Sequence, residues 1–360
     1  MIVDVTGFGW SGSGAVHDLL REYDDVQFAS FDDFEFTLLY QVDGIADLEY
    51  KLCQKHCRYG DSDKAISRFL ALVKALEDTK GFKYNELFKG QFYNICEKYI
   101  KKLTQVEFEA RNFDDVMSKS FREKRYIIER AIWSRLLSNR LIYPLMQKLF
   151  HRNLVNEIVK PNKHRIFLSY NPEKFLETTQ EFMEDLLTFF QKNNPKQLPL
   201  VTDQFFPPDG PEPYFKYVKE PAKCIVVKRD PRDLYLLAKF AYNSIVPIPT
   251  NTIDDFIVFY RKTIEETITP DTDKHITINF EELVYNYDET VKKIETFIGA
   301  TSHCKKNQFF NPNKSINNTQ LFNYYTDCKD DVAKIVSALP SSLFPFEKYQ
   351  KLESGRHIVY

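Results

Sequence analysis

A short apolar strand at the start of the chain runs into a glycine-rich turn, and this order constrains the fold more than any other feature. The opening MIVDV has the composition of a buried strand, and TGFGWSGSGAV follows it from Thr6 to Val16. The apolar residues of GAVHDLLREY are then spaced as on one face of a helix, and VQFAS has the composition of a second strand. Strand, glycine turn, helix and strand predict the opening of a parallel α/β sheet.

The alternation of strand and helix continues along the chain. QLPLVTD, KCIVVKR and HITINF predict further strands, and HRIFLSY predicts a return to strand after a long helical block. The helix after HRIFLSY is expected to begin with Asn171 as N-cap and Pro172 as its first residue, and YDETVKKIETFIGA predicts a helix that ends at Gly299. We predict an α/β fold with a P-loop-like, doubly wound sheet of mainly parallel strands, flanking helices and a helical insertion. The whole chain, 1–360, is expected to form a single domain, with the insertion at about 60–155.

Composition limits the classes of partner. The formal net charge is only −2 among 360 residues, so no overall field favours nucleic acid or an anionic membrane. No run approaches the ~20 apolar residues of a transmembrane helix, and no leader-like segment precedes the first strand. The six cysteines form no C-x-x-C pair, which favours reduced thiols. We therefore expect a cytoplasmic protein without a membrane span or a metal site; its oligomeric state is not readable from the sequence.

The glycine turn has three interpretations, all of which place an anion at the start of the first helix. Gly7, Gly9 and Gly12 have the spacing of a dinucleotide fingerprint. Gly7 and Gly12 also match the first half of a triphosphate P-loop. Ser11, Gly12 and Ser13 form the kind of serine-glycine turn that grips a 5′-phosphosulfate.

Later residues separate these interpretations in part. A triphosphate P-loop needs Lys and then Ser or Thr after its second glycine, whereas Ser13 and Gly14 follow here. A dinucleotide fold needs an acidic residue after the second strand, and Asp32 and Asp33 are available for that role. The dinucleotide interpretation stays open at this level.

A second anion site is indicated by KCIVVKRDPRDLYLLAKF. Its apolar strand delivers Arg229 to the carboxyl end, where ligands of open α/β sheets bind. The start of a helix explains Asp230 as N-cap, Pro231 as first residue and Asp233 in the first turn. It does not explain Arg229 and Arg232, which place two guanidinium groups at the same point. A bidentate phosphate clamp is the natural use of Arg229.

Taken together, these stretches resemble the sulfotransferases that use 3′-phosphoadenosine 5′-phosphosulfate (PAPS). FGWSGSGAV is similar to their 5′-phosphosulfate loop, and VVKRDPRDLY to their 3′-phosphate strand, turn and helix. ITINFEELVYNYDETVKKIETFIG resembles another family segment, and FNPNKSINNTQLF the late Lys-Ser-x-x-Asn segment of bacterial carbohydrate sulfotransferases. The likeness spans most of the chain outside the helical block.

The resemblance implies a role for most candidate residues. The implied reaction transfers a sulfuryl group from PAPS to a hydroxyl of a carbohydrate or similar acceptor and releases PAP, with no obligatory metal. Glu35 would act as its general base, and Lys314 would place a cation at the reacting group. Independently of the resemblance, Asp203 and Gln204 stand at the head of VTDQFFPPDGPEP, a segment rich in Pro and aromatic residues, and they are expected to contact the acceptor. The cofactor-binding residues would be Gly9, Trp10, Ser11, Gly12, Ser13, Gly14, Arg229, Arg232, Ser315 and Asn318.

Two positions depart from the family pattern. Trp10 stands where the family usually has Lys or Arg, and Leu237 stands where it usually has Ser. Two alternatives accordingly stay open: a dinucleotide-dependent oxidoreductase, and a degenerate sulfotransferase-like protein that binds PAP or a sugar without activity.

Overall fold

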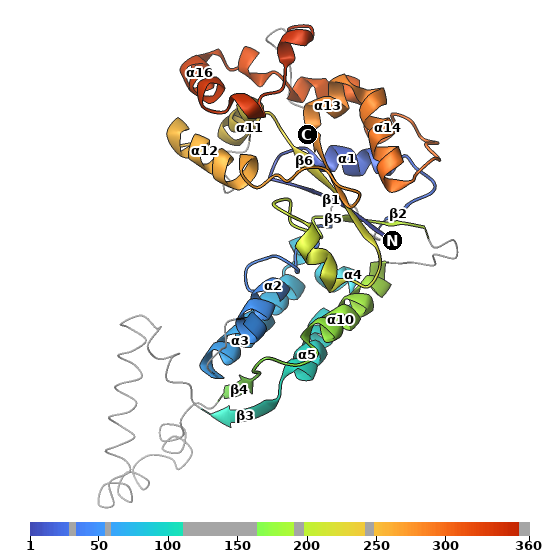
Figure 1. The fold of residues 1–360 in the computed structure, drawn as a ribbon, viewed down its shortest axis with the longest axis vertical. Helices are drawn as coiled ribbons and strands as arrows, with labels where there is room; N and C mark the ends of the chain where they lie inside the picture. Colours follow the sequence, from blue (N-terminus) through green and yellow to red (C-terminus); the bar gives the residue numbers. More distant parts are fainter. Residues whose placement is uncertain (29–33, 55–58, 111–163, 191–197, 242–247, 353–360) are drawn as a thin grey trace, which may run out of the picture.

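A five-stranded parallel sheet forms the centre of the protein (Figure 1). The computed structural model describes residues 1–28, 34–54, 59–110, 164–190, 198–241 and 248–352. The strands are β1 (Ile2–Gly7), β2 (Gln27–Phe28), β5 (Leu200–Asp203), β6 (Ala222–Lys228) and β7 (His275–Asn279), in the spatial order β2-β5-β1-β6-β7. The predicted α/β fold with a mainly parallel sheet and flanking helices is confirmed.

The register of the sheet brings its loops to one edge. Gly7 at the end of β1 pairs with Val227 of β6, and Val5 pairs with Asp203 at the end of β5. Because all neighbouring strands are parallel, the segments that follow β1, β5 and β6 emerge at the same carboxyl edge. The glycine turn therefore lies between the end of β5 and the end of β6.

Alternating residues of each strand pack against helices on the two faces of the sheet. On one face, Val3 and Val5 of β1 and Ile225 and Val227 of β6 share a hydrophobic cluster with α1 (Ser13–Leu20), α13 (Phe280–Tyr285) and α14 (Tyr287–Ile298). On the other face, Ile2 joins a cluster formed with the helical block. That block contains α2 (Ile45–Glu49), α3 (Tyr59–Asp78), α4 (Tyr84–Leu87), α5 (Phe92–Leu103) and α10 (Phe175–Phe190).

The block also contains an antiparallel pair of strands, only one of which the sequence predicted. HRIFLSY does form a strand, β4 (His164–Leu168), but it pairs antiparallel with β3 (Val106–Ala110) and does not join the central sheet. Figure 1 shows this pair at the end of the block that lies away from the sheet. β3 was missed because most of its residues are exposed and it lacks the apolar run of a buried strand. Residues 111–155, which make up most of the second half of the predicted insertion, lie outside the described residues.

The start of α10 also differs from the prediction. The helix begins at Phe175, whereas Asn171 has a φ of 43° and donates its backbone N–H to the carbonyl of Leu52. Asn171 is thus held in the left-handed region by a contact with the helical block, and it does not cap the helix. The predicted end of α14, by contrast, is confirmed, since Gly299 ends that helix with a φ of 79°.

A third hydrophobic cluster joins the helix after β6 to the C-terminal part of the chain. It contains residues of α11 (Pro231–Leu236), α12 (Ile253–Tyr260) and α16 (Lys329–Ala338). Phe8 and Trp10 of the glycine turn pack against the same cluster. No helix within the described ranges is long and apolar enough to cross a bilayer.

Candidate functional site

The glycine turn is a compact loop that leads into α1. The backbone N–H of Ser11 donates to the carbonyl of Phe8 (3.0 Å), and the N–H of Ala15 donates to the carbonyl of Gly12 (3.0 Å). Trp10 and Gly12 both have positive φ values, 61° and 95°. These two left-handed residues turn the chain so that α1 begins at Ser13, directly beyond the end of the central strand.

Two glycines of the turn are required by close packing. At Gly7 a Cβ would lie 2.2 Å from the Ser11 Oγ and 3.0 Å from the carbonyl oxygen of Val227. At Gly12 a Cβ would lie 2.5 Å from the ring of Phe280. The hydroxyl of Ser11 is buried against Gly7 and has no hydrogen-bond partner among the described residues. A buried, unpartnered hydroxyl at the N-terminus of a helix is suited to an anionic oxygen.

Arg229 connects the glycine turn to the C-terminal part of the chain. It follows β6, is buried, and donates from Nη1 to the carbonyl of Trp10 (3.2 Å) and from Nη2 to the carbonyl of Asn318. Its guanidinium lies over the ring of Phe280, 4.6 Å from the ring centre. The Arg229 carbonyl in turn accepts from the hydroxyl of Tyr260 (2.8 Å). Three of the stretches singled out in the sequence, together with Phe280 of ITINFEEL, therefore meet at one side chain.

Arg232 has a different environment from Arg229. Its guanidinium donates to both carboxylate oxygens of Asp230, at 2.9 and 2.6 Å, and to the carbonyl of Phe344 (2.9 Å). It also lies over two neighbouring rings, Phe322 and Phe346, at 4.6 and 5.2 Å from their centres. In this arrangement Arg232 fastens the C-terminal segment to the start of α11.

Two buried acids lie beside these arginines and have raised pKa values. Burial, together with the charge of Asp230, raises the pKa of Asp233 to about 7, against the opposing charge of Arg229. Burial and the charge of Asp230 likewise raise the pKa of Glu281 to about 8. The Glu281 Oε1 accepts the backbone N–H of Asp230 (3.0 Å). The arginines and carboxyls thus form a buried cluster of both charges at the carboxyl end of β6.

The C-terminal candidates lie on a short segment next to Arg229. Lys314 and Ser315 belong to α15 (Pro312–Ser315), and Asn318 ends the 3-10 turn that follows it. Lys314 is exposed, while Ser315 and Asn318 are half-buried. The structure therefore brings Asn318 to Arg229 and Trp10 through its backbone carbonyl, and it leaves the Lys314 side chain on the surface one turn earlier.

The candidates for acceptor contact lie on the other side of the glycine turn. Glu35 is exposed and forms an isolated parallel bridge with Asp203 at the end of β5. Gln204, with a φ of 55°, accepts from the Thr6 hydroxyl (2.8 Å) and donates to the Gly7 carbonyl (3.3 Å). The structure thus groups Glu35, Asp203 and Gln204 beside the end of β1. Asp32 and Asp33 lie outside the described residues.

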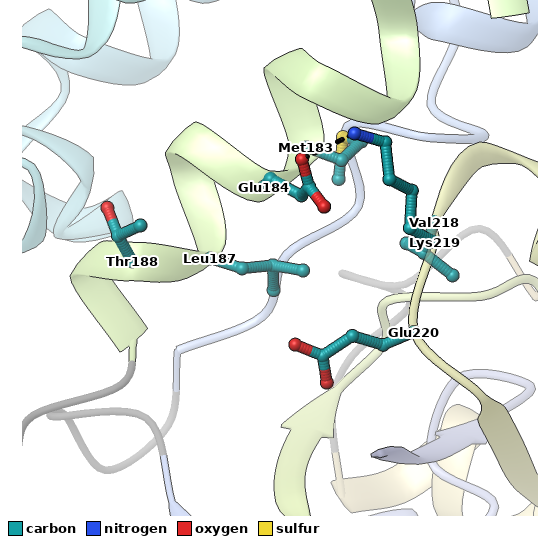
Figure 2. Close-up of a pocket in the computed structure, with 7 residues that line it drawn as sticks. All are labelled: Met183, Glu184, Leu187, Thr188, Val218, Lys219 and Glu220. Atoms are coloured by element: carbon teal, nitrogen blue, oxygen red, sulfur yellow. Dashed lines mark hydrogen bonds and ion pairs between the residues drawn. The ribbon is translucent and has the colours of Figure 1, made fainter. Parts of the chain in front are cut away.

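A cavity of about 130 Å³ lies elsewhere, between α10 and the segment before β6 (Figure 2). Its walls include Met183 and Leu187 of α10, and Lys219 spans its rim to Glu184 in an ion pair of 2.7 Å. Glu220, which also lines it, accepts from the N-terminal ammonium group of Met1 at the start of β1 (3.0 Å). The cavity therefore opens at the amino edge of the sheet, opposite the glycine turn.

Sequence reasoning missed several residues that shape the site. Phe280 packs against the turn, and two buried carboxylates, Asp4 and Glu22, accept backbone N–H groups from the surrounding loops. Asp233, which the sequence placed only in the first turn of a helix, also accepts backbone N–H groups. For Asp4 the signal was an ionisable residue inside the apolar run IVDV, but no pattern shows which loop such a residue contacts. Glu22 and Asp233 lie among other charged residues, and no comparable signal marks them. Among the described residues no cluster of His, Cys, Asp and Glu is arranged to hold a metal ion.

Comparisons of the chain with protein-family models, with curated proteins and with solved structures found no match. The class of protein is thus defined by the fold and the site alone. It is a parallel α/β protein with a glycine turn, a buried arginine and a C-terminal segment joined at the carboxyl edge of its sheet.

Proposed function

We propose that this protein is a PAPS-dependent sulfotransferase that acts on a hydroxyl of a carbohydrate or similar acceptor and releases PAP. The observation that carries the proposal is the convergence at Arg229 of the glycine turn and the C-terminal segment. The resemblance assigns these parts to the two ends of PAPS, and they are far apart in sequence. Their meeting at the carboxyl edge of the sheet is what a single nucleotide site requires.

The glycine turn would hold the 5′-phosphosulfate end. The N-terminus of α1 presents backbone N–H groups, and the Ser11 hydroxyl adds a buried donor whose partner is not supplied by the described residues. These groups fit an anion without a metal. The position of this turn after a central strand also supports a P-loop-like description of the sheet.

The 3′-phosphate end would lie toward β6 and the C-terminal segment. Arg229 supplies a buried positive charge there, and Ser315, Asn318 and Lys314 lie on the adjoining segment. Arg232 contributes by holding Asp230 and the C-terminal chain in place.

Transfer itself needs an acceptor hydroxyl that loses its proton as the sulfuryl group arrives. PAPS supplies an activated sulfuryl group when bound, and the protein's share is positioning and charge stabilisation. Glu35 would take the proton, because it is an exposed residue whose backbone pairs with Asp203, next to Gln204 and on the opposite side of the turn from Arg229. In an in-line displacement the acceptor oxygen would bond to the sulfur from the side opposite the bridging oxygen, which would leave with PAP. An acceptor held at Asp203 and Gln204 would lie on the other side of the turn from the 3′-phosphate.

The strand order argues against the dinucleotide alternative. In the Rossmann order 3-2-1-4-5-6 the second strand lies next to the first, so an acid after it reaches the bound ribose. Here β2 pairs with β5, and β5 separates it from β1. The strand order of this sheet therefore differs from the Rossmann order in the position of the second strand.

Calorimetry with PAP and NAD(H), followed by a transfer assay with sulfur-labelled PAPS and a panel of carbohydrates, tests the proposal. We expect PAP to bind, NAD(H) not to bind, and label to appear on an acceptor. PAP binding without transfer would favour the degenerate binding protein, to which Trp10 and Leu237 point. Absence of PAP binding would rule out the sulfotransferase and would leave, of the two, only a degenerate protein that binds a sugar, which calorimetry with the same carbohydrates tests. A cytoplasmic location stays a prediction that cell fractionation tests.

A further inference from the structure

The segment from His303 to Leu321 carries Lys314, Ser315 and Asn318, and we refer to it as the strap. It has little regular structure of its own, only the short α15 and a 3-10 turn. Most of residues 311–318 are half-buried or exposed. Side chains outside the strap must therefore fix its position next to Arg229.

One end of the strap is held by Glu22, which is fully buried just after α1. Its carboxylate accepts the backbone N–H groups of Asn307 (3.1 Å), Phe309 (3.0 Å) and Phe310 (3.1 Å). It also contacts the His303 Nε2 at 2.8 Å. A single carboxylate thus fixes the first half of the strap to the helix that begins at the glycine turn.

The other end is held by Asp233, which is fully buried in the first turn of α11. One of its oxygens accepts the N–H of Gln320 (2.8 Å), and the other accepts the N–H of Leu321 (2.7 Å). Asp233 lies only a few residues after Arg229, so this anchor ties the strap to the strand end that supplies the buried positive charge.

Backbone strain is located at both anchors. Asn307 and Gln320 have φ values of 60° and 52°, in the left-handed region that residues other than glycine seldom adopt. Such conformations cost about 1–3 kcal/mol each and persist only when their surroundings impose them. The two carboxylates accept N–H groups at Asn307 and at Gln320, so each anchor acts where the strap is strained.

We propose that Glu22 and Asp233 are positioning residues, which hold the strap against Arg229 so that Ser315 and Asn318 act on the 3′-phosphate of the nucleotide. The inference rests on the proposed function. Neither residue would touch the nucleotide; each would act through the backbone of the strap.

The substitutions Glu22→Gln and Asp233→Asn test this inference. Each replaces one acceptor oxygen by an NH₂ group that faces a backbone N–H, so one end of the strap loses its anchor without a change of side-chain size. Calorimetry with PAP and with adenosine 5′-monophosphate separates the effect on the 3′-phosphate from general loss of the site. We expect both variants to bind PAP at least about tenfold more weakly, while their affinity for the monophosphate changes about twofold or less.

Asp331→Asn is the matched control, because Asp331 accepts from the Tyr235 hydroxyl and Lys239 and holds no strap N–H group. It is expected to leave the ratio of PAP to monophosphate affinity unchanged.

If an anchor variant fails to fold, Tyr285→Phe gives a milder test, since it removes only a hydroxyl that contacts Thr319 (2.7 Å) and Gln320 (3.0 Å). A smaller loss, specific to PAP, is expected there.

The results of these measurements test the positioning role of Glu22 and Asp233 separately from the proposed sulfotransferase function. A wild-type chain that shows no preference for PAP over the monophosphate overturns the proposed function and the inference together. A wild type that prefers PAP, with folded variants that keep the same preference, overturns the inference alone and leaves the proposed function standing.

Discussion

Arg229 is the residue on which the proposed site depends most. Its guanidinium is buried on the ring of Phe280 and bound to the carbonyls of Trp10 and Asn318. It therefore has both a structural and a binding role. Substitutions at this position separate the two roles by their effects on folding and on affinity.

We expect Arg229→Ala to weaken PAP binding by about 100-fold or more, because charge-assisted hydrogen bonds contribute about 1.5–3 kcal/mol each. Arg229→Lys keeps the charge without the fork of donors, and an intermediate loss is expected. Calorimetry on variants whose thermal unfolding stays cooperative gives the measurement. Wild-type affinity for PAP in Arg229→Ala would remove the central claim.

Glu35 lies beside Asp203, away from the Arg229 side of the turn. We expect Glu35→Gln to keep PAP affinity and to lower the rate of sulfuryl transfer by about 10²–10⁴-fold, the usual contribution of a general base. Asp203→Asn is the matched comparison, and a smaller loss is expected there because that residue would only contact the acceptor. Equal turnover of Glu35→Gln and the wild type would assign the base to another group.

At the scale of elements, the turn between β1 and α1 combines residues that need glycine with residues that do not. Gly12 has a φ of 95° and lies against Phe280, whereas a Cβ at Gly14 would meet nothing within 4 Å. The spacing of glycines in the sequence does not separate these two positions. Only the packing of α13 on the turn does.

Gly12→Ala is expected to destabilise the fold by about 2 kcal/mol or more, from the left-handed backbone and the contact with Phe280. Gly14→Ala is expected to be neutral or to stabilise by up to about 1 kcal/mol, because Gly14 lies within α1 and alanine favours helix. Urea unfolding of both variants checks this pair. Equal effects at the two positions would contradict the packing of Phe280 on the turn.

The elements of the sheet were readable from sequence more readily than those of the helical block. β5, β6 and β7 are apolar runs that end in polar turns, and all were predicted. β3 and the true start of α10 were not, because each depends on a partner distant in sequence. β3 pairs with β4, and Asn171 donates to Leu52.

At the scale of the whole molecule, buried carboxyls connect stability to pH. Burial raises the pKa of Asp4 to about 7, against the opposing hydrogen bonds from the backbone of Phe206 and Phe205 and the side chains of Thr202 and Cys224. Asp233 and Glu281 are raised to about 7 and 8. Carboxyls of the unfolded chain have pKa values near 4, so between about pH 4 and 8 the folded protein binds more protons than the unfolded chain. These groups therefore lower the free energy of unfolding as the pH rises through that range.

For Asp4 alone, the free energy of unfolding is expected to be about 2–3 kcal/mol lower at pH 8 than at pH 5. Asp4→Asn removes the titrating group, so its unfolding free energy should fall less over the same interval. Urea unfolding at several pH values gives both slopes. Surface acids with lowered pKa values, such as Glu107 and Glu181, change stability mainly below about pH 4 and do not affect this comparison. Parallel slopes for the variant and the wild type would show that Asp4 does not titrate as described.

The sequence by itself determined the α/β class, the glycine turn at the start of α1 and the placement of Arg229 at a strand end. Apolar runs and glycine spacing are local, and they act through backbone conformation and burial. Only the tertiary structure decided that Arg229 meets Trp10 and Asn318, that Arg232 is bound to Asp230, and that Glu22 and Asp233 hold the strap. These contacts join residues that are mostly distant in sequence. A buried charge is stable only where the whole fold brings it a partner, and no local pattern specifies that partner.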